Sequence, residues 1–468
     1  MLFSTLFFLF VFLPLFFAVY WFVPARRWIL LGGSLVFYGW SEPVFIFVVI
    51  GSAVFDWALG HFIYAMPAGG GRRKWLVGVG VATNLGLLVY AKYTVFAVQN
   101  MDWILAHMGI APIRLPDIAL PLGVSFIVFE KITYLVDLYR HVAKPASSLL
   151  DYLNYVFLFP KLLAGPIVKY HDIAEQLTRP THRYEDVRDG AIRVIRGLSK
   201  KVLIADTLAP TADAVFNMQP AWIDSATAWF GLICFTLQIY FDFSGYTDIA
   251  IGLARILGFR LLENFNNPYL ATSFTDFWRR WHISLSSWIK EYLYIPLGGN
   301  RVSRLHSYIN LCICFLLSGL WHGASWNFVI WGCFHGLALV ADRAFYLEWQ
   351  KRLPRFVNTG VTMFLVVITW VFFRSKTAMD AFHFIYALIF RWKAVHSLIF
   401  LRSDSFVVTC VIAAGLVIVF LPAFKFSCAA PRLSAGRIPA LACCIVLLFL
   451  CFGRMADSTF HPFLYFRF

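Results

Sequence analysis

Three groups of polar residues stand out in an otherwise apolar sequence, and all of them lie between residues 238 and 336. The first is the segment Leu237-Gln-Ile-Tyr-Phe-Asp-Phe-Ser-Gly-Tyr-Thr-Asp248, which carries the carboxylates Asp242 and Asp248. A carboxylate inside an apolar run is costly in a membrane, so it must face a cavity or a partner. Two interpretations stay open: Asp242 binds substrate in such a cavity, or the carboxylates form structural ion pairs with buried arginines.

A second group follows at residues 273–292. Ser273 and Asp276 have the spacing of a helix capping pair, and apolar residues then recur at helical intervals. The pattern predicts a helix with one apolar stripe. Arg279 and Arg280 either snorkel to the membrane interface or belong to a re-entrant element that holds phosphates.

The third group is Gly319-Leu-Trp321-His322-Gly323-Ala-Ser-Trp326-Asn327, inside a stretch, 311–340, without Asp, Glu, Lys or Arg. Imidazole is the one side chain there that titrates near neutral pH, and small neighbours give a substrate room to approach. No nucleophilic-serine or phosphate-loop motif is present. We therefore expect His322 to act as a general base on a bound hydroxyl. The alternative is a histidine bonded to a neighbouring helix, which is our interpretation of His335.

The composition places these groups in a membrane. Of the 468 residues, 60% are hydrophobic and 14% charged, whereas soluble domains have about 45–50% and about 25%. This excludes a large soluble enzyme and a disordered or disulfide-stapled protein. We expect an all-α polytopic membrane protein of about 11–12 transmembrane helices, with shorter segments re-entrant or interfacial. Apolar candidates lie near 2–23, 28–40, 43–65, 75–97, 117–137, 149–168, 226–258, 308–325, 325–342, 358–373, 404–424 and 438–453.

The net charge is +15, from 40 Lys and Arg against 25 Asp and Glu. Cytoplasmic loops of membrane proteins are rich in Lys and Arg, so we expect contact with membrane lipid and no nucleic-acid partner. The longest charged stretch, 161–201, is placed in the cytoplasm. Its second half is amphipathic and predicts a helix lying against the membrane or the protein body.

Arg26 and Arg27 follow the first apolar run, so the N-terminus is expected outside the cytoplasm. Basic residues before the last run place the C-terminus outside as well, which gives an even number of spans. The basic residues from Arg374 to Arg402 fit poorly unless 381–391 re-enters. Nine cysteines, mostly in apolar stretches and without Cys-x-x-Cys spacing, are expected to be free thiols, with no structural disulfide and no metal site.

Several ordered motifs resemble the membrane-bound O-acyltransferase family, and the resemblance covers most of the chain. Those shared with the family at large are Tyr240-Phe-Asp-Phe-Ser-Gly-Tyr246, Glu263-Asn-Phe-Asn-Asn-Pro-Tyr269, Phe277-Trp-Arg-Arg-Trp-His-Ile-Ser284, Leu297-Gly-Gly-Asn300 and Gly319-Leu-Trp-His-Gly-Ala324. Those shared with its bacterial exopolysaccharide O-acetylation branch are Leu120-Pro-Leu-Gly-Val-Ser125 and Leu162-Leu-Ala-Gly-Pro-Ile167.

The resemblance implies a funnel of helices around a membrane-crossing tunnel, in a multi-pass protein of the bacterial cytoplasmic (inner) membrane. It implies an O-acetyltransferase that takes acetyl from cytosolic acetyl-CoA and passes it outward for O-acetylation of an exopolysaccharide. By motif, His322 matches the family's catalytic histidine and His282 its second functional histidine. A thioester carbonyl also needs polarisation, for which Trp321, Asn327 or a backbone N–H would serve. Arg279, Arg280 and Arg301 are candidates for the CoA phosphates.

The expected domain organisation is an acyltransferase domain, 1–453, with its polar core at 238–336, followed by an extracytoplasmic aromatic tail, 454–468. The tail, Phe460-His-Pro-Phe-Leu-Tyr465-Phe-Arg-Phe468, resembles a short aromatic motif with one central tyrosine found on this pathway. Tyr465 would relay the acetyl group to a periplasmic Ser-dependent acetyltransferase partner. The alternative is an aromatic anchor at the membrane interface.

Other functions stay open at this point. If the protein is a transporter or flippase of an acyl donor or lipid-linked sugar, transport should survive loss of His322. A structural scaffold for a secretion complex would depend on no single polar residue for acetylation. For the enzyme, an exopolysaccharide synthesis complex is an expected partner. The acetylated polymer is also open, since cellulose, alginate and peptidoglycan all fit.

Overall fold

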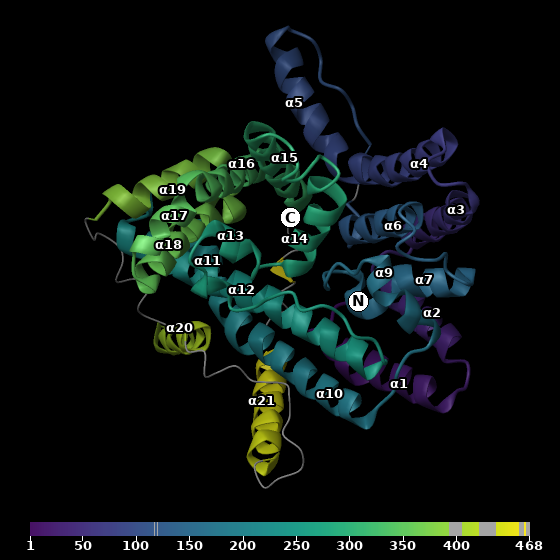
Figure 1. Ribbon diagram of the computed structural model, residues 1–468. Coiled ribbons are helices and arrows are strands. Elements are labelled where there is room, and N and C mark those ends of the chain that lie inside the picture. Colours follow the sequence, from purple (N-terminus) through teal and green to yellow (C-terminus); the bar gives the residue numbers. More distant parts are fainter. Residues whose placement is uncertain (117, 119, 393–404, 421–436, 458–462, 465–468) are drawn as a thin grey trace. The chain divides into compact units, whose positions relative to one another are not determined.

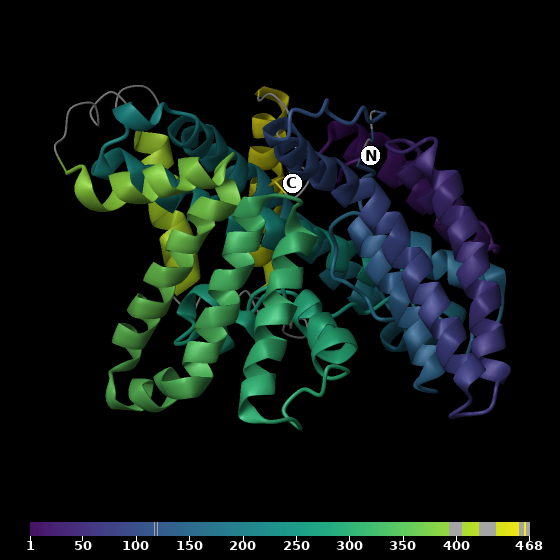
Figure 2. The same ribbon diagram turned by 90° about the horizontal axis from the view of Figure 1, so that it is seen from above.

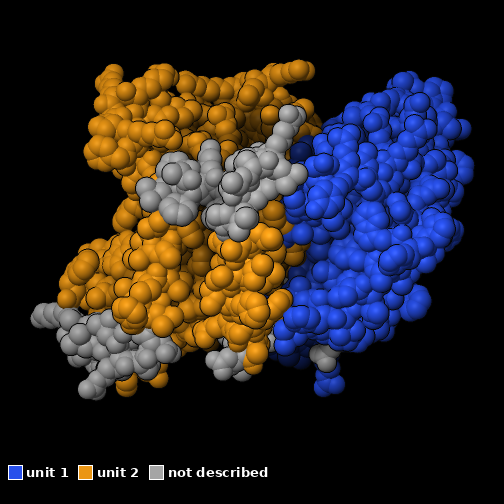
Figure 3. Space-filling model, turned by 90° about the horizontal axis from the view of Figure 1, so that it is seen from below, with its two compact units in different colours: residues 1–191, 250–262 blue, residues 192–249, 263–468 orange. Residues whose placement is uncertain are grey.

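The computed structural model describes residues 1–116, 118, 120–392, 405–420, 437–457 and 463–464. Every regular element in these ranges is helical and no strand occurs among them, which confirms the predicted all-helical class (Figure 1). The chain forms two compact units: unit 1 comprises residues 1–191 and 250–262, and unit 2 comprises residues 192–249 and 263–468 (Figure 3). The long helices α10 and α12 each contribute residues to both units.

Unit 1 holds the N-terminal helices. They are α1 (Leu13–Phe22), α2 (Arg26–Gly39), α3 (Phe45–Ala65), α4 (Gly71–Leu88), α5 (Thr94–His107), α6 (Val124–Tyr139), α7 (Leu149–Phe157), α8 (Phe159–Leu162), α9 (Tyr170–Thr178) and the first half of α10 (Tyr184–Ser199). Its core buries charged residues in pairs, because an unpaired charge in an apolar interior is strongly destabilising. Lys131 pairs with Asp56 at 3.0 Å, and Lys161 pairs with Glu130.

Unit 2 holds all three polar groups singled out above. Its helices are the end of α10, α11 (Asp206–Phe216), α12 (Ser225–Ile256), α13 (Phe274–Trp278), α14 (Ile283–Ile289), α15 (Arg304–His322), α16 (Trp326–Ala341), α17 (Leu347–Trp349), α18 (Arg355–Arg374), α19 (Ala378–Phe390), α20 (Ser405–Phe420) and α21 (Arg437–Asp457). Helix α16 packs against both α15 and α18, and the three belong to the row of green helices in Figure 2.

Within the described residues, six helices are long and apolar enough to cross a membrane. They cover Phe45–Ala65, Gly71–His107, Ser225–Ile256, Arg304–His322, Trp326–Arg352 and Arg355–Arg374. Four shorter apolar helices accompany them, at Phe8–Phe22, Ala378–Phe390, Phe406–Phe420 and Leu441–Ala456. The chain is therefore a multi-pass membrane protein, as the composition predicted.

The amphipathic helix predicted in the charged stretch is confirmed as α10, followed by the π-helical turn Lys200–Ala205 (η3). Within unit 2 it lies against α12: a Cβ on Gly197 would be only 2.5 Å from the Gly245 carbonyl oxygen, so the two backbones touch. Three cations of α10 and η3 then converge on the buried Asp248. Its carboxylate accepts hydrogen bonds from Arg193, Arg196 and Lys200 at 3.0, 2.8 and 2.7 Å.

The prediction of one continuous helix from residue 274 is wrong. The helix does begin at Phe274 with Ser273 as its cap, whose hydroxyl accepts from the Asp276 N–H at 3.1 Å. It ends after one turn and restarts as α14, because His282 adopts a left-handed backbone conformation with φ of +46°. Residues 381–391, whose re-entry the loop charges would require, overlap helix α19 (Ala378–Phe390).

Candidate active site

Helices α15 and α16 form a tightly packed hairpin that ends at His322. A Cβ on Gly319 would lie 2.2 Å from the Phe328 carbonyl oxygen, and one on Gly332 would lie 2.4 Å from the Phe315 carbonyl oxygen. Only glycine permits this approach, so the seam brings the backbones into direct contact. His322 is the last residue of α15 and is fixed by this contact at the turn between the two helices.

Aromatic rings surround the His322 imidazole. The ring centroids of Trp331 and Phe373 lie 5.1 and 5.2 Å from it, both edge to face, and that of Phe328 lies 6.4 Å away. The side chains come from α16 and α18, and His322 is buried. These rings limit the access of bulk water to the imidazole.

His282 occupies a second buried position, between α13 and α14. Its Nδ1 lies 3.2 Å from Asn264 Oδ1, an oxygen that also accepts hydrogen bonds from the N–H and the hydroxyl of Ser284. Since that oxygen is an acceptor, Nδ1 carries the proton and Nε2 is the basic nitrogen. Burial lowers the pKa of His282 to about 3, which keeps the imidazole neutral at physiological pH.

Trp321 links the two histidines. Its ring centroid lies 6.0 Å from that of His282 and 5.0 Å from that of His322. The structure thus brings together three of the predicted site residues, which come from two segments separated by about 40 positions.

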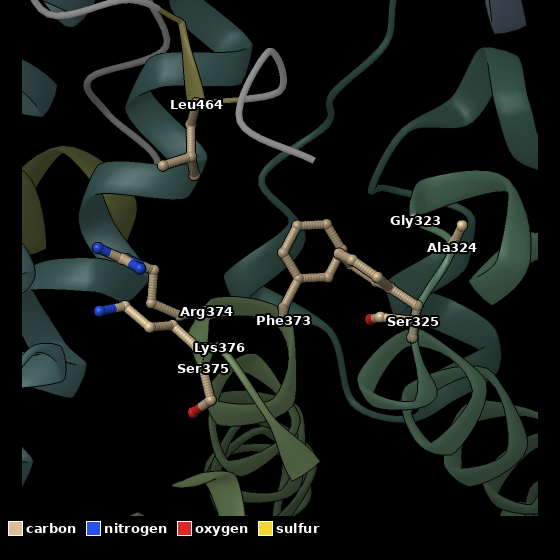
Figure 4. A pocket seen from close by; sticks show the side chains of 9 residues that line it. Gly323, Ala324, Ser325, Phe373, Arg374, Ser375, Lys376 and Leu464 are labelled. Carbon is tan, nitrogen blue, oxygen red and sulfur yellow. The ribbon is translucent and has the colours of Figure 1, made fainter. Parts of the chain in front are cut away.

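A pocket of about 310 Å³ opens beside His322 (Figure 4). Its walls come from the turn after α15, from the end of α18 and from residue 464, and the lining residues are Gly323, Ala324, Ser325, Phe328, Phe373, Arg374, Ser375, Lys376 and Leu464. In Figure 4 the Phe373 ring stands between the turn at Ser325 and the two basic side chains, which extend to the same side. The pocket combines an apolar wall with hydroxyl and cationic groups.

Residues 463 and 464 of the C-terminal tail dock inside unit 2. Both side chains are only 3% exposed. The Phe463 ring lies 4.7 Å from Tyr246 and 5.9 Å from Phe243, and Phe243 in turn lies 4.7 Å from the His282 ring. Leu464 reaches the wall of the pocket beside His322. Tyr465, the next residue, lies outside the described residues.

The predicted substrate-binding residues have the following partners. Asp242 is paired with Lys201 at 2.7 Å and accepts the Leu464 N–H at 2.7 Å. The Asn327 amide donates to the Ser375 carbonyl at 2.7 Å, at the edge of the pocket. For Asp248 the structure shows the second of the two interpretations given above, a structural ion pair with arginine: its carboxylate pairs with Arg193 and Arg196.

The three candidate phosphate ligands differ in their surroundings. Arg279 and Arg301 are exposed, whereas Arg280 is paired with Asp276 at 2.8 Å on the same short helix and turn. His335 bonds to neighbouring elements through both ring nitrogens, to Trp278 at 3.2 Å and to Thr369 at 3.1 Å, in agreement with a structural histidine.

Sequence reasoning missed several residues of the site. Phe373 and Leu464 carry no signal of their own, because a phenyl ring and a leucine are common in any membrane protein, whereas Asn264 lies in the motif Glu263–Tyr269 but was not singled out from it. Arg374 and Lys376 did carry one, since both break the expected charge asymmetry of the loops.

Unit 2 of this multi-pass helical protein thus combines two buried histidines, linked by Trp321, with a pocket beside one of them, His322. The family described as MBOAT, membrane-bound O-acyltransferase family, matches residues 138–373, about half of the chain and the part that contains both histidines. The chain belongs to this family, and it is a membrane-bound O-acyltransferase.

Relatives match over most of their length. The probable alginate O-acetylase AlgI of Azotobacter vinelandii is 37% identical over all of both chains. The protein of the same description from Pseudomonas aeruginosa is 43% identical over 81% of this chain and 73% of its own. A peptidoglycan O-acetyltransferase of Helicobacter pylori is 36% identical over 81% of this chain and 78% of its own.

Proposed function

We propose that this protein is a polysaccharide O-acetylase of the bacterial cytoplasmic membrane. It takes an acetyl group from acetyl-CoA on the cytosolic side and delivers it to the outer side for O-acetylation of an exopolysaccharide. The observation that carries the proposal is the pocket beside His322, whose opposite wall is Leu464, the residue before Tyr465. A candidate base, a space for an acyl group and residue 464 of the tail therefore lie close together within one unit.

The first chemical step is acyl transfer to the Tyr465 hydroxyl. His322 takes the phenolic proton as the oxygen attacks the thioester carbonyl, and the carbon–oxygen bond forms. The carbon–sulfur bond then breaks, and the departing thiolate takes the proton from the imidazolium to give CoA. A phenol has an unperturbed pKa near 10, so it is more readily deprotonated than a sugar hydroxyl.

The second step delivers the acetyl group outside the membrane. The serine oxygen of a periplasmic acetyltransferase partner attacks the aryl ester, and the serine hydroxyl proton goes to the departing phenolate. A polymer hydroxyl then attacks the acetyl-serine, the serine ester bond breaks, and the proton of the polymer hydroxyl returns to the serine. The aryl ester keeps a good leaving group, so no further activation of the acetyl carbon is needed.

The remaining residues of the site have supporting roles in this proposal. His282 is held neutral by burial and oriented by Asn264, which suits a hydrogen-bond partner for the reacting groups. The exposed guanidinium groups of Arg279 and Arg301 are available for CoA phosphates, and Arg280 would join them by exchanging its partner Asp276.

The similarity to alginate O-acetylases over the full chain favours a polyuronate as the acetylated polymer. The Helicobacter pylori relative keeps peptidoglycan as a second candidate. Cellulose has no support among these relatives. A mutant lacking this chain, complemented with the gene and assayed for acetyl content of each polymer, distinguishes the candidates.

The test of the mechanism replaces the base. Acetyl transfer from labelled acetyl-CoA in membrane vesicles should fall by about 10²–10⁴-fold in His322→Ala and in His322→Gln, because neither side chain accepts the phenolic proton. His335→Ala is the matched control, since His335 is buried in the same helical hairpin but bonded to other helices. Its activity should follow the amount of folded protein. Normal transfer in His322→Ala would contradict the proposal and favour a transporter.

A further inference from the structure

The carboxylate of Asp242 has two partners of different kinds, one on each oxygen. Oδ1 lies 2.7 Å from the ammonium of Lys201, and Oδ2 accepts the backbone N–H of Leu464 at 2.7 Å. The residue is 1% exposed, in the middle of α12. A buried carboxylate needs such compensation, and here a main-chain amide of the tail supplies part of it.

Lys201 is shared between two acids. Besides Asp242 it pairs with Asp206 at 2.7 Å, and its own side chain is 5% exposed. One ammonium shared by two carboxylates does not fully offset the cost of desolvating either of them. The second oxygen of Asp242 therefore needs a further hydrogen-bond donor. The Leu464 N–H meets that demand.

The tail is held by side-chain packing next to this hydrogen bond. Phe463 lies against Phe243 and Tyr246, which follow Asp242 on the same helix. Together, the three residues of α12 form a docking site for residues 463 and 464. Asp242 binds a backbone amide, which every residue except proline has, so this hydrogen bond alone does not distinguish one tail residue from the next. The packing of the Phe463 ring against Phe243 and Tyr246 makes that distinction, because it sets the register in which the tail docks.

We propose that Asp242 is a positioning residue for the C-terminal tail: together with Lys201 it holds the Leu464 amide and thereby fixes the tail at the wall of the pocket beside His322. This inference rests on the proposed function for the role of Tyr465, but the docking itself does not. Asp242 thereby acts through the tail and touches no reacting atom.

Amide hydrogen exchange of the purified full-length protein tests the docking. The peptide that covers the tail should exchange about 10-fold to 100-fold faster in Leu464→Pro, which removes the donor, and in Asp242→Asn, which removes the charge. Asp242→Asn leaves Lys201 paired with Asp206, so no buried cation loses its last partner. Leu464→Ala is the matched control for the first variant, because it shortens the side chain and keeps the N–H.

Acetyl transfer supplies the second measurement. In Asp242→Asn and Leu464→Pro, kcat should fall at least about tenfold while the KM for acetyl-CoA stays within about twofold, since the proposed ligands of the CoA phosphates, Arg279, Arg280 and Arg301, are not part of the tail docking site. Unchanged tail exchange in both variants would overturn the docking proposal, whatever the activity. Faster exchange together with full activity in Tyr465→Phe would leave the docking intact and overturn the relay.

Discussion

His282 combines two properties that a single substitution can separate. Its backbone lies in the left-handed region, which costs most residues about 1–2 kcal/mol but which asparagine adopts readily. Its imidazole is neutral because burial lowers its pKa to about 3. The conformation breaks the helix and turns the ring toward Trp321, so local backbone geometry is what places this histidine in the site.

We therefore expect His282→Asn to fold normally and to lose about 10²-fold or more in acetyl transfer, since asparagine keeps the backbone and has no basic nitrogen. His282→Ala should lose stability in addition. The pH profile of the wild type between pH 5 and 8 should show no inflection from His282, because a group with a pKa near 3 does not titrate there. Thermal unfolding and initial rates of the two variants check the first point, and wild-type activity in His282→Asn would exclude a chemical role.

The sequence predicted single residues unevenly. His322 stood out because it is an ionisable group in a stretch without charges, and the structure places it beside a pocket. The Asp242 carboxylate stood out as well, but one of its two partners is a backbone amide 222 residues away, and a main-chain N–H has no sequence signature. Pairings of this kind become visible only when the tertiary arrangement is known.

At the scale of elements, the seam between α15 and α16 depends on glycine. A methyl group on Gly319 would meet a backbone oxygen at 2.2 Å, which no side-chain rotation relieves. Separation of the two helices would displace His322, the terminal residue of α15. The hairpin therefore couples close packing to the position of the base.

Gly319→Ala should accordingly destabilise the protein by about 1–3 kcal/mol, as overpacked cores generally are, and lower acetyl transfer. Gly360→Ala on α18 is the matched control: a Cβ there meets nothing within 4 Å, so stability should not fall and should rise by about 0.4–1 kcal/mol, as for other glycines replaced at unstrained helical positions. The melting temperature in nanodiscs and the transfer rate measure both effects. Equal behaviour of the two variants would show that the seam tolerates a methyl group.

Helix periodicity predicted the existence of most elements but not their ends. The stretch expected at 75–97 extends over Gly71–His107, because its flanks are helical without being strongly apolar. The segment after residue 273 was expected as one helix, and a single left-handed residue divides it. An apolar stripe reports which face is buried and is insensitive to a local break of this kind.

At the scale of the whole molecule, loop charges predict that both termini lie outside the cytoplasm. The basic residues Arg374 and Lys376, which oppose the pattern, line the pocket, so their position is explained by the site rather than by topology.

An alkaline phosphatase fused after residue 468 should therefore be active, because the enzyme folds only outside the cytoplasm. The same reporter inserted at residues 179–183, between α9 and α10, should be inactive. An inactive C-terminal fusion at normal protein level would contradict the predicted topology. It would also remove the route by which the tail reaches the pocket from the outer side.

The pairing between α10 with its following turn and α12 has a consequence for biogenesis. A carboxylate at the centre of a lone membrane helix opposes insertion by about 2.5–3.5 kcal/mol, and α12 carries Asp242 and Asp248. Their cationic partners, from Arg193 to Lys201, precede α12 in the chain and leave the ribosome first. When α12 reaches the translocon, the basic residues that neutralise Asp242 and Asp248 have therefore already been synthesised. Stable insertion of this helix is thus a folding event, and it depends on the order in which the polypeptide is made.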